Sequence, residues 1–199
     1  MKIKNKVRNN LIISLIDEKP EFEYISLNQV HGDKVFFAED YKEKDKKGDG
    51  LITRTGKILC VKTADCIPLV ILTENPLFYG IFHVGWRSLF KGIIKKGIRE
   101  FLKYGFNLKN LYAYLGPSIC SNCYEVGIEF KDFDNQFLFK RKNKFFYDLR
   151  GKSVYELLKM GVKNIHLSSL CTFEKNFLPS YRRDKNKRRI FSFVMPYKI

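Results

Sequence analysis

Eight short apolar runs, rich in β-branched and aromatic residues, constrain the fold of this chain more than any other feature. Each spans five to nine residues, the usual length of a β-strand. The runs lie at residues 22–30, 34–38, 57–63, 67–73, 77–84, 111–116, 164–169 and 189–195. They predict a protein that consists mainly of β-sheet.

Two segments show signals of an α-helix. Residues 88–105 place their apolar side chains on one stripe and most of their basic side chains elsewhere. Ser88 can cap the start of this helix, and Gly105 can end it in the left-handed conformation. A second helix is predicted to follow Asp148 as N-cap and to stop at Gly161. Many strands with few helices predict an α+β protein built on mixed β-sheets.

The composition predicts one globular domain over residues 1–199, with 45% hydrophobic and 15% aromatic residues. No apolar run approaches the roughly 18–20 residues that a membrane crossing requires. The basic start of the chain lacks the small-residue site of a signal peptide, and five cysteines do not suit a secreted disulfide framework. We therefore expect a cytoplasmic protein with no membrane association, and we favour a monomer.

The net charge of +16 predicts an attraction for anions. Nucleic acids and phosphate-bearing small molecules are the two candidates. The sequence has no RNA- or DNA-binding motif with interleaved aromatic residues, so nucleic acid is the less favoured partner. A basic zinc module that binds RNA ranks third among the functions considered.

Two of the three histidines and one cysteine point to a metal site. His31 lies where a strand breaks into a glycine-containing turn, His83 ends an apolar strand, and Cys66 directly precedes one. Side chains at strand ends can converge on one point. Two imidazoles and a thiolate suit Zn²⁺ and leave its fourth position open. Each residue taken singly is more often structural, and the spacing matches no zinc finger.

Two other chemistries remain open for the same residues. Cys66 and His83 can act as nucleophile and base in a cysteine hydrolase, with Asp65 or a backbone group orienting the imidazole. Such a pair does not need His31, whereas a metal does. A single copper ion is also compatible with these ligands, but three histidines cannot supply a multicopper oxidase centre.

The remaining cysteines are predicted to be packing or loop thiols. The pair Cys120 and Cys123 forms a C-x-x-C, but no histidine is followed by the glutamate of a cytidine-type deaminase. No βαβ pattern surrounds the pair, as a thioredoxin-like role would require. Cys60 and Cys171 receive the same interpretation, and His166 is predicted to be structural.

Several motifs occur in a fixed order over nearly the whole chain: "NQVHGD", "GDGLIT", "TADCIPLVI", "FHVGWRSL", "LGPSICSNCYEVG", "LCT" and "SYRRD". Together they resemble the YfiH-like family, also called the polyphenol oxidase or laccase-domain family. The resemblance implies a purine nucleoside phosphorylase with adenosine deaminase activity. It implies zinc at His31, Cys66 and His83, and adenosine, inosine, guanosine and 5′-methylthioadenosine as substrates. The implied fold is a four-layer αββα sandwich.

The chain departs from the family pattern in three places. The region around 126–150 is compact, and "ICSNCYEVG" stands where "IGPCCYEVG" is common. Arg188 and Arg189 replace the usual Gly-Arg after "SYRRD". The three candidate metal ligands are unaffected by these changes.

Three arginines are candidates for binding an anionic substrate group. Arg87 follows His83 by four residues at the start of a predicted helix, where N–H groups favour anions. We assign it to phosphate, with a structural ion pair as the alternative. Arg182 and Arg183 in "SYRRD" are further candidates, with ordinary surface charge as the alternative.

Two aspartates and one tyrosine complete the candidate site. Asp49 and Asp65 are possible general acids or bases, or groups that orient a ligand imidazole. The alternative for Asp49 is a turn formed with its neighbouring glycines. Tyr124 follows the family motif and is a candidate substrate contact, with core packing as the alternative.

Overall fold

The computed structural model describes residues 1–16, 20–39 and 46–197. Its strands are β1 (Lys2–Val7), β2 (Asn10–Ile16), β3 (Ile25–Ser26), β4 (Val35–Phe37), β5 (Gly50–Thr53), β6 (Leu59–Thr63), β7 (Ile67–Leu72), β8 (Tyr79–Val84), β9 (Tyr112–Leu115), β10 (Glu125–Val126), β11 (Leu138–Arg141), β12 (Lys144–Tyr147), β13 (Asn164–Leu167) and β14 (Ile190–Pro196). Its helices are α1 (Trp86–Phe90), α2 (Ile93–Lys103), α3 (Phe130–Phe133), α4 (Leu149–Lys159) and α5 (Tyr181–Asp184). None of the helices in these ranges has the length and apolar character that a membrane crossing requires.

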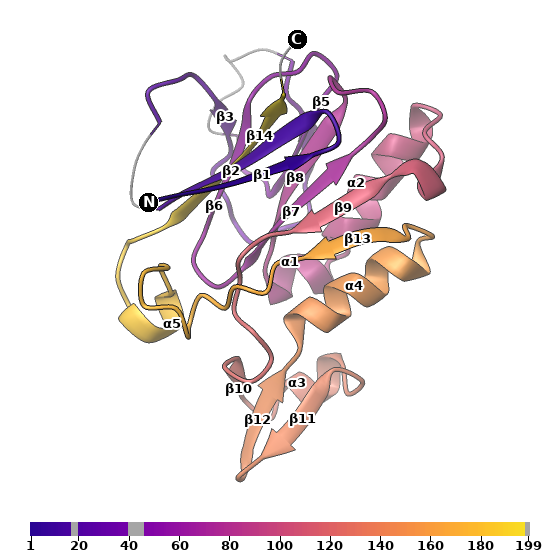
Figure 1. Cartoon of the computed structure of the whole chain (residues 1–199). Helices are drawn as coiled ribbons and strands as arrows, with labels where there is room; N and C mark the ends of the chain where they lie inside the picture. The colour runs from indigo at the N-terminus through magenta and orange to yellow at the C-terminus, as the bar shows by residue number, and fades with distance from the viewer. Residues whose placement is uncertain (17–19, 40–45, 198–199) are drawn as a thin grey trace.

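Two mixed sheets form the body of the fold (Figure 1). The five-stranded sheet has the order β1-β2-β14-β6-β3, and the six-stranded sheet has the order β13-β9-β7-β8-β5-β4. Each sheet contains both parallel and antiparallel pairs. The chain passes from the first sheet to the second between β6 and β7, so the residues of this crossover lie at one end of both sheets.

The core between the sheets follows from the alternation of side chains along β7. Val70 and Leu72 face the five-stranded sheet and form a buried cluster with Leu59, Val61 and Val194 of that sheet. A strand with apolar residues at every position, as in "IPLVIL", is expected where both faces of a sheet are covered. The second face of β7 therefore also needs a cover.

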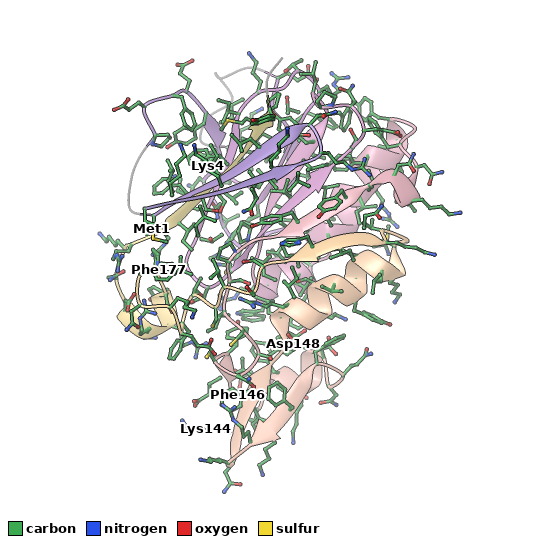
Figure 2. All side chains as sticks on the ribbon, viewed as in Figure 1. Met1, Lys4, Lys144, Phe146, Asp148 and Phe177 are labelled. Atoms are coloured by element: carbon green, nitrogen blue, oxygen red, sulfur yellow. The ribbon has the colours of Figure 1, made fainter. Side chains whose placement is uncertain are left out.

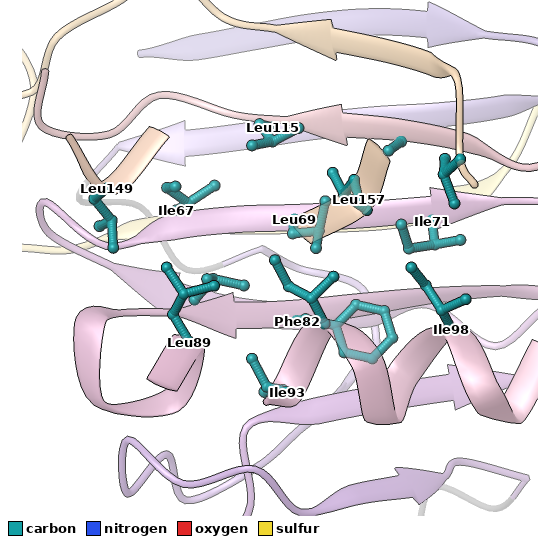
Figure 3. Close-up of a cluster of buried hydrophobic side chains, with 14 of the residues drawn as sticks. Ile67, Leu69, Ile71, Phe82, Leu89, Ile93, Ile98, Leu115, Leu149 and Leu157 are labelled. Atoms are coloured by element: carbon teal, nitrogen blue, oxygen red, sulfur yellow. The ribbon is translucent and has the colours of Figure 1, made fainter. Parts of the chain in front are cut away.

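Helices α2 and α4 provide that cover (Figure 3). Ile67, Leu69 and Ile71 of β7 point to the helical layer and form one buried cluster with Ile98 of α2 and Leu157 of α4. Burial of an aliphatic side chain of this size stabilises a fold by about 1.5–3 kcal/mol. The cluster therefore fixes β7, the strand that "TADC" precedes.

A loop covers the outer face of the five-stranded sheet in the described part of the chain. The rings of Phe22 and Tyr24 pack edge-on against Phe193 of β14, with centroid separations of 5.3 and 5.2 Å. The predicted α+β sandwich with mixed sheets is confirmed. The described residues place this loop, rather than a helix, where the fourth layer of the sandwich was expected.

The predicted helix over 88–105 is two helices. Helix α1 ends at Phe90, and α2 begins after Gly92, whose φ of 88° lies in the left-handed region that glycine tolerates. The single predicted helix was wrong at this point. Helix α1 also begins earlier than predicted, because Gly85 is its N-cap and the Ser88 hydroxyl accepts the Gly85 N–H at 2.9 Å.

The second predicted helix is confirmed as α4. Its N-cap Asp148 accepts the N–H of Gly151 at 2.9 Å, and Gly161, at φ 94°, follows its end. A small sheet of β10, β12 and β11 precedes α4 and projects from the sandwich together with α3 (Figure 1). Figure 2 shows Phe146 in this small sheet and Asp148 where it joins α4. Strands β1, β2, β5 and β10–β12 lie outside the predicted strands.

Candidate active site

Strand ends and one loop meet at one end of the sandwich. Cys66 directly precedes β7, Asp49 directly precedes β5, and His83 is the penultimate residue of β8. Both β7 and β5 pair antiparallel with β8, which brings their first residues beside the end of β8. His31 comes from the loop between β3 and β4. The sequence prediction that these residues converge is thus realised in the structure.

The three candidate metal ligands form a compact group. One ligand atom each of His31, Cys66 and His83 lies within 4.8 Å of the others, and the two imidazole rings are 4.7 Å apart between centroids. A tetrahedral Zn²⁺ with bonds of 2.0–2.3 Å would place such atoms about 3.3–3.8 Å apart. Ligand atoms that lie within 4.8 Å of one another are compatible with this spacing, so the donors suit the ion.

Asp49 holds two of the three residues in place through hydrogen bonds. Its fully buried carboxylate accepts the backbone N–H groups of Val30, His31 and Gly32 at 3.2, 3.0 and 2.7 Å. It also lies 2.8 Å from Nδ1 of His83. This contact assigns the Nδ1 proton to the bond with the carboxylate and leaves Nε2 of His83 free to bind a metal. Asp49 therefore orients one ligand imidazole directly and the other through its loop.

Two residues at the site have backbone conformations that are unfavourable for any residue other than glycine. His31 and Asp65 have φ values of 55° and 86°, and such strain is concentrated at functional sites. A Cβ atom on Gly85 would lie 2.9 Å from the Cys66 sulfur and 3.3 Å from Cδ2 of His31. Gly85 therefore permits the close approach of α1 to the site, and the sequence analysis did not identify this role.

The charges of Cys66, His83 and Asp49 depend on one another. Burial opposes ionisation of Cys66, but the charge of His83 and hydrogen bonds from both imidazoles lower the pKa of its thiol to about 6. Burial also opposes protonation of His83, but Cys66 and Asp49 raise its pKa to about 9. The pKa of Asp49 is lowered, because its hydrogen bonds outweigh its burial. Without a metal, the lowered pKa of Cys66 and the raised pKa of His83 both favour a thiolate–imidazolium pair.

Asp65 connects the site to the C-terminal part of the chain. Its carboxylate accepts the hydroxyl of Thr172 and the backbone N–H of Arg182, each at 2.7 Å. Both oxygens are thus engaged in holding loops that are more than 100 residues away in sequence. The contacts give Asp65 a positioning role, and Thr172 is a partner that the sequence analysis did not identify.

Tyr124 and two arginines lie beside the candidate metal ligands. The Arg182 guanidinium is 5.4 Å from the Tyr124 ring centroid, and the Arg87 guanidinium stacks on Trp86 at 4.5 Å. Burial is the main cause that raises the pKa of Tyr124, and the charge of the nearby Cys66 is the second, so the Tyr124 hydroxyl keeps its proton. Arg87 and Arg182 are exposed, which leaves their charges accessible to an anionic ligand.

The Arg183 side chain, unlike that of Arg182, donates hydrogen bonds to backbone carbonyls. Its guanidinium donates to the backbone carbonyls of Thr172, Phe173 and Leu178 at 2.7–2.9 Å, and it pairs with Asp184 at 2.6 Å. These contacts engage the whole fork of donors in holding the loop. The structure therefore brings Arg182 to the site and commits Arg183 to the protein backbone.

Two sheets that carry a His₂Cys group at one end define the class of protein: an α+β sandwich with an open three-donor centre. Residues 4–196 match the model of the family described as multi-copper polyphenol oxidoreductase laccase. The chain belongs to this family, and the YfiH-like resemblance of its motifs is confirmed.

Two curated relatives carry names of enzymes. A purine nucleoside phosphorylase from Aquifex aeolicus is 38% identical over 168 residues, which are 84% of this chain and 80% of the relative. The purine nucleoside phosphorylase YfiH of Escherichia coli is 29% identical over 177 residues, covering 84% of this chain and 72% of the relative.

Solved structures show the same fold. The hypothetical protein YfiH of Bacillus licheniformis superimposes with a TM-score of 0.79 at 26% identity, covering 87% of this chain and 74% of that chain. A Neisseria meningitidis protein of the DUF152 family superimposes with a TM-score of 0.86 at 21% identity, covering 99% of each chain. The second match supports the fold alone.

Proposed function

We propose that this protein is a zinc-dependent purine nucleoside phosphorylase with adenosine deaminase activity. The observation that carries the proposal is the group of His31, Cys66 and His83, ordered from behind by the buried carboxylate of Asp49. The names of the relatives supply the substrate class. We further propose that residues 1–199 act as one catalytic domain in the cytoplasm.

Zinc is preferred to copper on the number and kind of donors. The family description names a multicopper oxidoreductase, but the whole chain contains three histidines. A blue-copper site and a trinuclear cluster together need many more imidazoles than this. Two imidazoles and a thiolate suit one zinc ion with an open position, and a single copper ion is the alternative.

A zinc ion held by these three residues supplies Lewis-acid chemistry at its fourth position. The chain itself provides the orientation of the ligands. Asp49 fixes the tautomer of His83, because its carboxylate receives the Nδ1 proton, and it holds the loop that carries His31. The centre is therefore ordered before any substrate arrives, which reduces the reorganisation needed for reaction.

Phosphorolysis requires a cationic site for phosphate and a donor for the purine. A phosphate oxygen attacks the anomeric carbon of the ribose, and the bond from that carbon to the purine nitrogen breaks. The purine leaves with the bonding electrons and takes up the proton that the hydrogen phosphate gives up. Arg182 and Arg87 are assigned to the phosphate because their charges are exposed beside the centre. Tyr124 is assigned to a hydrogen bond with the substrate, because its hydroxyl remains protonated.

The substrates proposed are adenosine, inosine, guanosine and 5′-methylthioadenosine. Incubation of the protein with each nucleoside, with and without phosphate, measures the released base, the sugar phosphate and any deaminated product. We expect phosphate-dependent release of base and sugar phosphate in equal amounts. Release without phosphate, or no release from any purine nucleoside, would overturn the assignment.

A matched pair of variants locates the activity. His31→Ala removes a proposed ligand, whereas His166→Ala removes an exposed imidazole that stacks on Tyr114. We expect His31→Ala to lose the zinc ion of this site and its turnover, and His166→Ala to keep both. Equal activity of the two variants would contradict the assignment of His31.

A cysteine hydrolase is the second candidate, and one observation favours it. Cys66, His83 and Asp49 have the order of a nucleophile, a base and an orienting carboxylate, and the pKa of Cys66 is lowered to about 6. Alkylation of metal-free protein distinguishes the two functions. If metal-free protein has full activity and loses it on alkylation of Cys66, the protein is a cysteine hydrolase rather than a zinc enzyme.

A further inference from the structure

A second group of sulfur and oxygen donors lies outside the site described above. Cys120 and Cys123 come from one turn, and Cys171 and Glu174 come from another. One ligand atom of each residue lies within 4.8 Å of the other three. The two turns thus form C-x₂-C and C-x₂-E halves, a spacing that zinc sites use for pairs of ligands.

Two distances from the Glu174 carboxylate match those expected around a bound zinc ion. Glu174 Oε1 lies 3.4 Å from the Cys120 sulfur and 3.5 Å from the Cys123 sulfur. A tetrahedral Zn²⁺ with a Zn–S bond near 2.3 Å and a Zn–O bond near 2.0 Å would separate the two donors by about 3.5 Å. The carboxylate therefore already stands at the distance that shared coordination requires.

The two turns are held side by side by the backbone. Ser118 and Cys171 form a parallel β-bridge, and Thr172 N–H donates to the Ser118 carbonyl at 3.0 Å. The backbone N–H of Cys120 donates to the Cys171 sulfur at 3.3 Å. Hydrogen bonds of this kind stabilise a thiolate, which is the form of cysteine that binds a metal.

Two arginines hold the turns in place through hydrogen bonds to backbone carbonyls. The buried Arg150 donates to the Ser118 hydroxyl at 3.0 Å and to the carbonyls of Ser118 and Leu170, one in each of the two segments. Arg183 donates to the carbonyls of Thr172 and Phe173, directly before Glu174. The four donors are therefore on fixed backbone rather than on loose loops, as a preorganised site needs.

We propose that Cys120, Cys123, Cys171 and Glu174 bind a second zinc ion, in a closed site with a structural role. Three thiolates and one carboxylate complete a tetrahedral shell and leave no position for substrate. The site is separate from the group of His31, Cys66 and His83, with which it shares no residue.

The second zinc ion would support the candidate active site through sequence neighbours. Tyr124 directly follows Cys123, and Thr172 directly follows Cys171 and donates to Asp65. Asp65 in turn holds the backbone of Arg182. Fixing the two turns therefore fixes the tyrosine and the arginine that we assign to the substrate.

Metal analysis of the full chain tests the proposal. The protein is produced with zinc in the medium, purified under reducing conditions without chelator, and its zinc is measured by mass spectrometry. We expect about two zinc ions per chain in the unchanged protein and about one in Cys123→Ser. Cys60→Ala is the matched control, because it removes a buried thiol of the core and should keep both ions.

A second variant covers the case in which Cys123→Ser does not fold. Glu174 is exposed, so Glu174→Gln should fold normally and lose zinc to a chelator faster than the unchanged protein. Replacement of zinc by Co²⁺ provides the spectroscopic readout. We expect strong sulfur-to-cobalt absorption that persists in His31→Ala and falls in Cys123→Ser.

The outcomes separate this proposal from the proposed function. If only the second site binds zinc, the unchanged protein holds one ion, which His31→Ala keeps and Cys123→Ser loses. If zinc content and cobalt absorption are the same in Cys123→Ser, Glu174→Gln and the unchanged protein, the second site does not exist. A disulfide between Cys120 and Cys123 in protein purified with reductant would equally overturn it.

Discussion

Replacement of Asp49 by asparagine tests the origin of the order in the candidate active site. The substitution changes the shape of the side chain little but replaces one acceptor oxygen by a donor NH₂ group. In the native protein, Oδ1 accepts from the His31 backbone and His83, and Oδ2 accepts from the backbones of Val30 and Gly32. Whichever way the amide turns, two donors lose their acceptor.

The magnitude follows from the burial of the carboxylate. Asp49 is fully buried and His83 is 3% exposed, so water cannot replace the lost partner. Removal of one member of a buried charged pair costs about 3–5 kcal/mol. Loss of the group that orients a ligand imidazole lowers metal affinity by about 10–100-fold. We expect both effects in Asp49→Asn.

Urea unfolding of metal-free protein and competition with a zinc chelator measure the two effects. Asp33→Asn is the matched control, because this aspartate pairs with the exposed Lys96 at the surface and should change the free energy of unfolding by about 1 kcal/mol or less. If Asp49→Asn differs from the unchanged protein by no more than the control does, Asp49 does not organise the site.

Three further predictions address the chemistry and packing of the site. Zinc affinity should rise about tenfold per pH unit between about pH 7 and 9, because zinc must displace the proton of His83, whose pKa is about 9. Cys66, with a pKa of about 6, is already ionised in this range. An affinity that does not change with pH in chelator competition would refute the coupling. Gly85→Ala should lower zinc occupancy, because its Cβ would lie 2.9 Å from the Cys66 sulfur; unchanged occupancy by metal analysis would show that the backbone yields. Tyr124→Phe should lower kcat/KM about 2–10-fold with zinc content unchanged, the effect of losing one neutral hydrogen bond; steady-state kinetics at the unchanged value would remove its substrate contact.

The sequence was sufficient to identify the candidate ligands. His31, Cys66 and His83 are uncommon residue types at the ends of predicted strands, and the ordered motifs around them belong to one family. The convergence of Cys66 and His83 follows from the pairing of β7 with β8, and Asp49, directly before β5, holds the loop of His31 beside them. The strand ends nominated these residues, and the ordered family motifs carried most of the information about this site.

The partners of the aspartates were not predictable in the same way. Asp49 lies between two glycines, so a turn and an orienting role were equally compatible with the sequence. Asp65 contacts Thr172 and Arg182, which reach it only because loops distant in sequence pack together. Such contacts depend on the tertiary fold and leave no periodic pattern in the chain.

Other features left signals that were weak or easily overlooked. Strand β1, "KIKNKV", alternates exposed lysines with less exposed side chains, a period of two that is typical of a surface strand. The break between α1 and α2 occurs at Gly92, which helical periodicity alone does not mark as a stop. Glu174 follows Cys171 by three residues, and only the structure shows that these two side chains lie beside Cys120 and Cys123.

The dependence of turnover on metal tests the central claim most directly. Protein is stripped of metal, assayed with inosine and phosphate, and assayed again after addition of zinc. We predict that metal-free protein is inactive and that zinc restores formation of hypoxanthine and ribose 1-phosphate in equal amounts, but not in His31→Ala. Full activity of the metal-free protein, or restoration of His31→Ala by zinc, would contradict a zinc-dependent phosphorylase at His31, Cys66 and His83.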